Sequence, residues 1–198
     1  MAGISAILIA AGESTRMGCP KPLLPWHGLT LLEYQIQSLT AGGTAEVVVV
    51  LGSQADLISP YVKGPLVRCV VNPDYRLGKT TSIRAGLRAV DPEIDGILLL
   101  AVDQPRTPEI ISTVIRAHVG NKALITSPRF QGRGAHPLIF SASLIAELER
   151  ISEDRQGVRE VLQAHKHEVT EVEIADPLVR LDLNTPEAFE EAKTRYGA

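Results

Sequence analysis

Residues 8–21 read Leu-Ile-Ala-Ala-Gly-Glu-Ser-Thr-Arg-Met-Gly-Cys-Pro-Lys. They start within an apolar run, Ile4–Ala11, which predicts a strand buried on both faces. The run breaks at Gly12, and a loop with two glycines, two hydroxyls and two cations follows. Backbone N–H groups of such a loop can surround phosphate oxygens, and α/β proteins bind ligands at the carboxyl ends of their strands. The stretch therefore predicts an α/β fold with a polyanion site, where Arg16 and Lys21 supply positive charge.

The spacing of this loop excludes two familiar phosphate motifs. A P-loop has four residues between its first glycine and a Gly-Lys-Ser/Thr end. Here five residues separate Gly12 from Gly18, and Cys-Pro follows. A Gly-x-Gly-x-x-Gly dinucleotide fingerprint is also missing from the sequence. The remaining alternative to an anion site is an ordinary loop between a strand and a helix.

The bulk composition predicts one domain, residues 1–198, with a substantial core. The chain is 44% hydrophobic and 22% charged, and its formal net charge of −3 gives no support for binding nucleic acid or a membrane. Two distant cysteines without zinc-ligand spacing indicate free thiols in a reducing cytoplasm. No apolar run reaches the ~20 residues of a membrane span, and the N-terminus lacks the basic start of a signal peptide.

Short apolar, β-branched runs alternate with segments of helical spacing in the first half of the chain. This alternation predicts βαβ units, a mostly parallel sheet and helices on both of its faces. Helical spacing occurs around residues 32–39, 83–90 and 110–115, and Thr-Pro-Glu at 107–109 and 185–187 predicts two helix starts. The predicted strands are Ile4–Ala11, Glu46–Leu51, Val67–Val71 and Ile97–Val102.

The second half of the chain is less regular. Helices are predicted around residues 144–151 and 158–165. A mixed sheet with at least one antiparallel strand is expected from this half. The predicted strands are Ala123–Thr126, Leu138–Phe140, Glu168–Ile174 and a short final strand at Leu178–Leu183.

Asp103 follows directly after a predicted buried strand. In a parallel sheet its carboxylate faces the same crevice as the Gly12 loop. A carboxylate and a triphosphate repel each other unless a cation lies between them. Mg²⁺ is the natural candidate, because it binds one or two carboxylates together with phosphate oxygens. The alternative is that Asp103 caps a helix or a turn.

The loop resembles the signature of nucleotidyltransferases that act on the molybdenum cofactor and on sugar phosphates, Leu-x-Ala-Gly-x-x-x-Arg-Met-Gly-x-x-Lys. Its Ala-Ala-Gly variant, and the triplet Asp103-Gln-Pro105, are similar to the molybdenum cofactor cytidylyltransferases. Glu13 departs from the family pattern, and we expect it to point outward because a carboxylate would repel triphosphate. The resemblance implies a three-layer α/β/α, Rossmann-like sandwich and covers the chain from Leu8 to about Glu187.

Asp182 and Asn184 resemble the second metal motif of this family. In a strand both side chains would face the same side, so either could bind a metal ion. The alternative is that Asn184 caps the last helix, with Glu187 as its capping-box partner.

Three further segments resemble ligand-binding segments of the family. Asn72–Gly86 resembles the segment that borders the base and ribose. The alternative is a loop followed by an amphipathic helix, which does not explain why a glycine stands at position 86. A close approach of the helix to the sheet or to a ligand would account for this glycine. Residues 132–137 and 154–159 are similar to segments on the acceptor side, with surface loops as the alternative.

The resemblance implies roles for individual residues. Catalysis is assigned to Arg16, Lys21 and Asp103. Nucleotide binding is assigned to Leu8, Ala10, Ala11, Gly12, Ser14, Arg16, Lys21, Asn72, Gly78, Ser82 and Asp103. Acceptor binding is assigned to Gln104, Gly134, His136, Pro137, Asp154 and Arg159, and Mg²⁺ binding to Asp103, Asp182 and Asn184.

The implied reaction is transfer of CMP from CTP, or of a nucleoside monophosphate from another NTP, to the phosphate of molybdopterin. A molybdenum hydroxylase or its chaperone is the implied protein partner. Two alternatives stay open. The acceptor could be a sugar phosphate or methylerythritol phosphate, or the chain could be a noncatalytic nucleotide-binding chaperone for a molybdenum enzyme.

Overall fold

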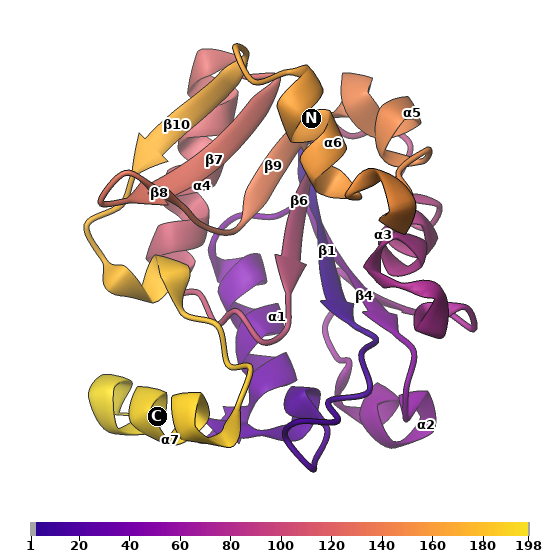
Figure 1. The fold of residues 1–198 in the computed structure, drawn as a ribbon, viewed down its shortest axis with the longest axis vertical. Coiled ribbons are helices and arrows are strands. Elements are labelled where there is room, and N and C mark those ends of the chain that lie inside the picture. Colours follow the sequence, from indigo (N-terminus) through magenta and orange to yellow (C-terminus); the bar gives the residue numbers. More distant parts are fainter. Residues whose placement is uncertain (1–2, 198) are drawn as a thin grey trace.

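The computed structural model describes residues 3–197. Within them, eight strands form one sheet in the order β10-β7-β9-β6-β1-β4-β5, with β8 paired to β7 outside this path (Figure 1). A separate two-stranded ribbon joins β2 and β3. The strands are β1 Ile4–Ala10, β2 Pro25–Trp26, β3 Leu29–Thr30, β4 Glu46–Leu51, β5 Val67–Val71, β6 Gly96–Ala101, β7 Ile125–Phe130, β8 Arg133–Gly134, β9 Leu138–Ser141 and β10 Val169–Glu173.

The sheet is mostly parallel, as predicted. β1 lies between β4 and β6 and is parallel to both, and β5 and β10 are parallel to their neighbours β4 and β7. β9 is antiparallel to both β6 and β7, and it supplies the predicted antiparallel strand. The register pairs Ile9 of β1 with Ala101 of β6, so the loops that follow these two strands leave the sheet side by side.

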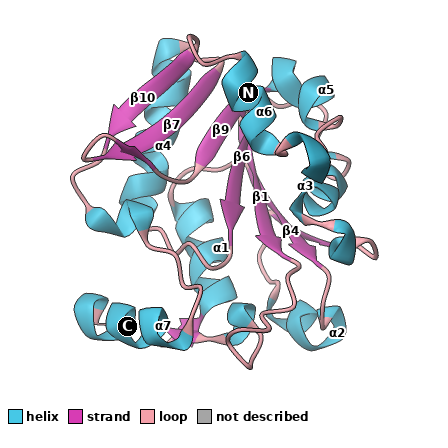
Figure 2. Cartoon of the chain, in the orientation of Figure 1, coloured by secondary structure: helices cyan, strands magenta, loops and turns pink. Residues whose placement is uncertain are grey.

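Helices cover both faces of the sheet (Figure 2). Side chains of β1 alternate between two cores: Ala6 and Leu8 pack with α1, α4 and α7, whereas Ile7 and Ile9 pack with α3, α5 and α6. This alternation produces the three layers implied by the family resemblance. The helices are α1 Leu31–Ala41, α2 Ala55–Ile58, α3 Lys79–Leu87, α4 Pro108–Asn121, α5 Ile145–Leu148, α6 Val158–Ala164 and α7 Pro186–Tyr196. Among residues 3–197, no helix combines the length and the apolar character needed to cross a membrane.

Local capping explains where the main helices begin. Thr30 caps α1 through a reciprocal capping box with Glu33, and Thr107 caps α4 by accepting a hydrogen bond from the N–H of Ile110. Thr185 caps α7 in the same way through the N–H of Ala188. The ring of Phe189 on α7 then packs against buried Trp26, with ring centroids 6.4 Å apart, which brings the end of the chain beside the first loop.

The predicted strand at Leu178–Leu183 is wrong. Residues 177–180 form a 3-10 helix, and residues 181–184 have no regular structure. Pro177 lacks an N–H for a strand ladder, and the carbonyls of Leu178 and Leu181 accept hydrogen bonds from buried Arg106 instead of a neighbouring strand. The helix predicted around residues 144–151 is also shorter than expected, because it consists of a 3-10 turn and the single-turn α5.

Gly86 is explained by a close approach of α3 to β1. A Cβ atom at this position would lie 2.5 Å from Cγ2 of Ile7, which is buried in the sheet. The absence of a side chain therefore lets α3 pack directly on the central strand.

We predict that Gly86→Ala lowers the free energy of unfolding, by roughly 1–3 kcal/mol, because the clash with Ile7 outweighs the better helix propensity of alanine. Urea unfolding would measure this change in the free energy of unfolding. Gly120→Ala in α4 is the matched control, since no atom lies within 4 Å of the place its new methyl group would take, and it should stabilise by up to about 1 kcal/mol. Equal effects of the two substitutions would contradict the close packing of α3.

Candidate active site

Two adjacent pockets lie at the carboxyl ends of β1 and β6. The first, which we call the loop pocket, has a volume of about 320 Å³ and is lined by the loop after β1, the start of α3 and the end of β6. The second, the sheet pocket, has a volume of about 570 Å³ and lies between β6, β7, α3 and α6. Predicted nucleotide residues that line the loop pocket are Ala10, Ala11, Gly12, Ser14, Arg16, Lys21, Ser82 and Asp103. Predicted acceptor residues that line the sheet pocket are Gln104, Gly134, His136 and Arg159.

The loop after β1 forms a tight turn that leaves its backbone donors free. Ser14 has a φ of 55°, and its carbonyl accepts a hydrogen bond from the N–H of Met17 at 2.9 Å. Its hydroxyl accepts one from the N–H of Lys21 at 3.1 Å, which closes the loop. Within the described chain, the backbone N–H groups of residues 12–16 donate to no other protein group. Such free donors suit a phosphate ligand.

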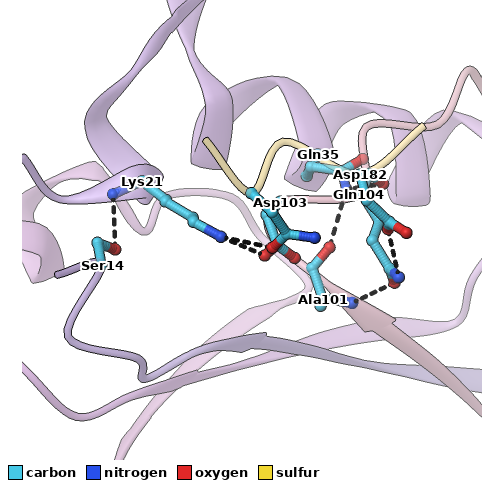
Figure 3. Close-up of polar contacts among 8 residues, drawn as sticks. Ser14, Lys21, Gln35, Ala101, Asp103, Gln104 and Asp182 are labelled. Atoms are coloured by element: carbon cyan, nitrogen blue, oxygen red, sulfur yellow. Dashed lines mark hydrogen bonds and ion pairs between the residues drawn. The ribbon is translucent and has the colours of Figure 1, made fainter. Parts of the chain in front are cut away.

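Lys21 joins the first loop to two distant segments (Figure 3). Its Nζ donates to Oδ2 of Asp103 at 2.7 Å and to Oδ1 of Asn184 at 2.9 Å. The side chain of Lys21 is only 12% exposed and that of Asp103 is 22% exposed, so this ion pair is partly protected from water. Oδ2 of Asp103 and Oδ1 of Asn184, which belong to different segments, therefore contact the same ammonium group.

Asp182 and Asn184 do not share a direction, contrary to the strand prediction. Asp182 accepts a hydrogen bond from Nε2 of Gln104 at 2.8 Å, whereas Asn184 contacts Lys21 beside Asp103. The N–H of Leu183, between them, donates to the carbonyl of Asp103 at 2.8 Å. The alternative that Asn184 caps the last helix is wrong, because Thr185 caps α7.

Gln104 lines the sheet pocket, but its amide is engaged within the protein. Its Oε1 accepts from the N–H of Ala101, and its Nε2 donates to Asp182. Buried Gln35 donates to the Gln104 carbonyl at 2.6 Å and accepts from the N–H of Arg106 at 3.1 Å. These contacts hold the turn that presents Asp103 (Figure 3).

Five of the residues predicted to bind the nucleotide or the acceptor line neither pocket. Leu8 is fully buried in the core, and Asn72 is 3% exposed, with its amide donating to the hydroxyls of Thr81 and Ser82. Gly78 precedes α3 with a φ of 115° and packs on Glu153. Pro137 is buried, and Asp154 is exposed on a 3-10 turn.

Glu13 points away from the loop pocket, as expected. Its Oε1 accepts a hydrogen bond from Nε of Arg76 at 3.0 Å, and both side chains are exposed. The carboxylate is therefore neutralised at the rim of the loop, where water screens the pair and leaves it little influence on stability.

The sequence did not indicate the part played by Arg106. Its guanidinium is buried and donates to four backbone carbonyls, those of Pro105, His136, Leu178 and Leu181, at 2.8–2.9 Å. Burial lowers the pKa of Arg106 to about 10, and Asp182 and Asp103 oppose this shift. The group stays charged at neutral pH and ties together the segments that carry Asp103, His136 and Asn184.

We predict that Arg106→Leu lowers the free energy of unfolding by roughly 3 kcal/mol or more, because it leaves the carbonyls of Pro105, His136 and Leu181 without a donor. Chemical denaturation would measure the change. Arg116→Leu on exposed α4 is the control and should change stability by less than about 0.5 kcal/mol. A similarly small effect of Arg106→Leu would show that the carbonyls find other partners.

His136 faces the sheet pocket as a neutral imidazole. Burial lowers its pKa to about 4, and the positive charges of Lys79 and Arg106 add to this effect. Its side chain can therefore donate or accept a hydrogen bond at neutral pH without bringing a charge to a ligand.

We predict that the folded protein loses stability as the pH falls from about 6.5 to about 4, in part because unfolded His136 binds a proton that folded His136 does not. The free energy of unfolding, measured across this range, should fall less steeply in His136→Gln. NMR should place the titration midpoint of the imidazole near 4. Parallel stability profiles, or a midpoint near 6.5, would contradict the buried neutral state.

The structure defines an α/β protein with two adjacent pockets at the carboxyl ends of its strands, the place where proteins of this class bind ligands. Residues 6–169 match the MobA-like NTP transferase domain. The chain belongs to this family of nucleotidyltransferases, which confirms the resemblance seen in the sequence.

Two relatives are similar along nearly the whole chain. The molybdenum cofactor cytidylyltransferase of Escherichia coli is 30% identical over 198 residues, which cover 99% of this chain and 98% of that protein. The nicotine blue oxidoreductase of Paenarthrobacter nicotinovorans is 31% identical over 194 residues, which cover 93% of each. The relatives thus carry different activities, so overall similarity alone does not select one.

Solved structures of Rv0371c from Mycobacterium tuberculosis H37Rv share the fold. One superposes with a TM-score of 0.83 at 28% identity and covers 96% of this chain and 97% of that one. A second, a complex with manganese, has a TM-score of 0.78 at 27% identity and covers 95% and 96%.

Proposed function

We propose that this protein is a cytoplasmic molybdenum cofactor cytidylyltransferase, which transfers CMP from CTP to the phosphate of molybdopterin and releases pyrophosphate. The observation that carries the proposal is the pair of pockets that meet at the ends of β1 and β6. A transferase of this kind must hold two substrates with their phosphates adjacent, and adjacent pockets provide that arrangement.

The loop pocket is assigned to the nucleotide. Free N–H groups of residues 12–16 and the charges of Arg16 and Lys21 suit a triphosphate. Ser82 lies at the opposite wall, where the amide of Asn72 orients its hydroxyl at 3.0 Å. We assign Ser82 to the base or ribose, and Asn72 and Gly78 to positioning this wall.

The sheet pocket is assigned to the acceptor. Its lining is mixed, with apolar Ile83, Leu99, Leu138 and Leu162 beside polar and charged residues that include His136 and Arg159. The apolar side chains would pack on a flat heterocycle such as a pterin, and the polar groups would contact its phosphate.

Asp103 and Asn184 would hold Mg²⁺ at the place that the ammonium of Lys21 takes in this structure, and Lys21 would then turn to the phosphates. Mg²⁺ takes few protein ligands and fills its coordination shell with phosphate oxygens and water. Within residues 3–197 there is no group of three or more His, Cys, Asp or Glu side chains that could hold a metal ion. Asp182, held by Gln104, is then a positioning residue. When bound, the metal ion would neutralise negative charge on the phosphates.

The residues of the chain would act mainly by positioning and by electrostatics. An oxygen of the acceptor phosphate forms a bond to the α-phosphorus, and the bond to the β-phosphate breaks, with its electron pair leaving on pyrophosphate. Arg16 and Lys21 line the loop pocket and would stabilise charge on this leaving group. No general base is required, because a phosphate monoester, with its second pKa near ~6, is mostly dianionic at neutral pH.

We predict that the purified protein with Mg²⁺ and molybdopterin releases pyrophosphate with CTP faster than with GTP, ATP or UTP. Asp103→Asn should lower the rate by at least ~10²-fold, because it removes the negative charge at the converging oxygens. Asp56→Asn on exposed α2 is the matched control and should keep the full rate. Melting temperatures of both variants should stay close to that of the wild type.

Other outcomes would select other functions. Turnover with methylerythritol phosphate or a sugar phosphate, but not with molybdopterin, would show that the acceptor is one of these compounds. Binding of CTP without pyrophosphate release, together with capture of a molybdenum hydroxylase, would indicate a chaperone. Manganese in place of Mg²⁺ would test which ion supports the reaction.

A further inference from the structure

The loop pocket and the sheet pocket meet along a short boundary. Ile9, Lys79 and Ala101 are the lining residues that the two pockets share. Ile9 and Ala101 are paired in the register of β1 and β6, so the boundary runs over the ends of the central strands. Lys79 is the first residue of α3 and supplies the charge at this boundary.

The charge of Lys79 is not neutralised by the protein. Lys21 pairs with Asp103 in the loop pocket, and Arg129 pairs with Glu171 in the sheet pocket. Lys79, in contrast, forms no ion pair with any carboxylate of residues 3–197, and its side chain is exposed. Lys79 lines both pockets, and its positive charge adds to the effect of burial that lowers the pKa of His136.

We propose that Lys79 is a catalytic residue that contacts phosphate oxygens of both substrates at this boundary. The proposal rests on the function proposed above, since the new bond joins an acceptor oxygen to the α-phosphorus where the two pockets meet. Both substrates bring negative charge to that place before the bond to pyrophosphate breaks. A lysine ammonium suits the task, because it is a mobile point charge with three donors and can contact two phosphates at once.

Lys79→Met tests the proposal, because methionine keeps most of the length of the side chain and removes its charge. Lys79→Arg restores the charge, and Lys63→Met removes an exposed lysine that lines neither pocket. Rates of pyrophosphate release with CTP, molybdopterin and Mg²⁺ give kcat and KM. Titration with inorganic phosphate, followed by the NMR signal of His136, reports on anion binding in the sheet pocket without turnover.

Lys79→Met should lower kcat by ~10²-fold, the effect of removing one donor from a reacting phosphate or oxyanion. It should also weaken phosphate binding by roughly tenfold, as the loss of one charge-assisted hydrogen bond does. Lys79→Arg should recover most of both losses, and Lys63→Met should show neither. A kcat for Lys79→Met within a factor of about 3 of the wild type would overturn the proposal.

Two further results separate this proposal from the proposed function. If the wild-type protein releases no pyrophosphate with any NTP, the cytidylyltransferase function fails, and the phosphate titration decides the role of Lys79. Weaker phosphate binding by Lys79→Met then supports an anion contact at the boundary, and unchanged binding overturns it. A lower melting temperature for both Lys79 variants, with equal losses of kcat, would assign Lys79 a structural role and also overturn the proposal.

Discussion

The buried guanidinium of Arg106 is the interaction on which the geometry of the site depends. Four backbone carbonyls accept hydrogen bonds from this one group, and that of Leu178 also accepts one from the N–H of Leu181. They belong to the turn after β6, the loop before β9 and the irregular segment before α7. An unpaired carbonyl in the interior costs about 1–3 kcal/mol, so none of these segments can shift without a loss of stability. The guanidinium of Arg106 lines neither pocket, but its hydrogen bonds fix the spacing between Asp103, His136 and Asn184.

The parallel sheet provides the second constraint. β1 and β6 are neighbours in the same direction, so the loop that begins at Gly12 and the turn that carries Asp103 leave the sheet together. Antiparallel β9 then lies on the other side of β6 and brings His136 to the adjacent pocket. Two adjacent pockets, one bordered by free backbone donors and one with a mixed apolar and charged lining, arise from a single edge of the sheet.

The sequence predicted those features that depend on local patterns. The strand runs, the caps at Thr107 and Thr185 and the loop after β1 follow from hydropathy and turn chemistry, and parallel pairing was enough to place Asp103 near Lys21. The strand predicted at Leu178–Leu183 is wrong because its apolar residues are spaced like those of a strand, whereas the carbonyl of Leu178 accepts a hydrogen bond from a side chain 72 residues away.

Contacts between distant segments explain the other omissions. The hydrogen bonds of Arg106 and Gln35 leave no periodic signal in the sequence, and the position of Lys79 between two pockets depends on how α3 packs on β1. The partner of Glu13 could not be predicted either, because Arg76 lies 63 residues further along the chain.

The hydrogen bond between Lys21 and Asn184 spans 163 residues of the chain. During synthesis on the ribosome, the first loop therefore emerges long before its last partner does. The segment around Asp103 can join it earlier, but the ring of contacts closes only when α7 docks through Phe189 on Trp26. A nascent or prematurely terminated chain that stops before Asn184 would thus carry the first loop without this hydrogen bond.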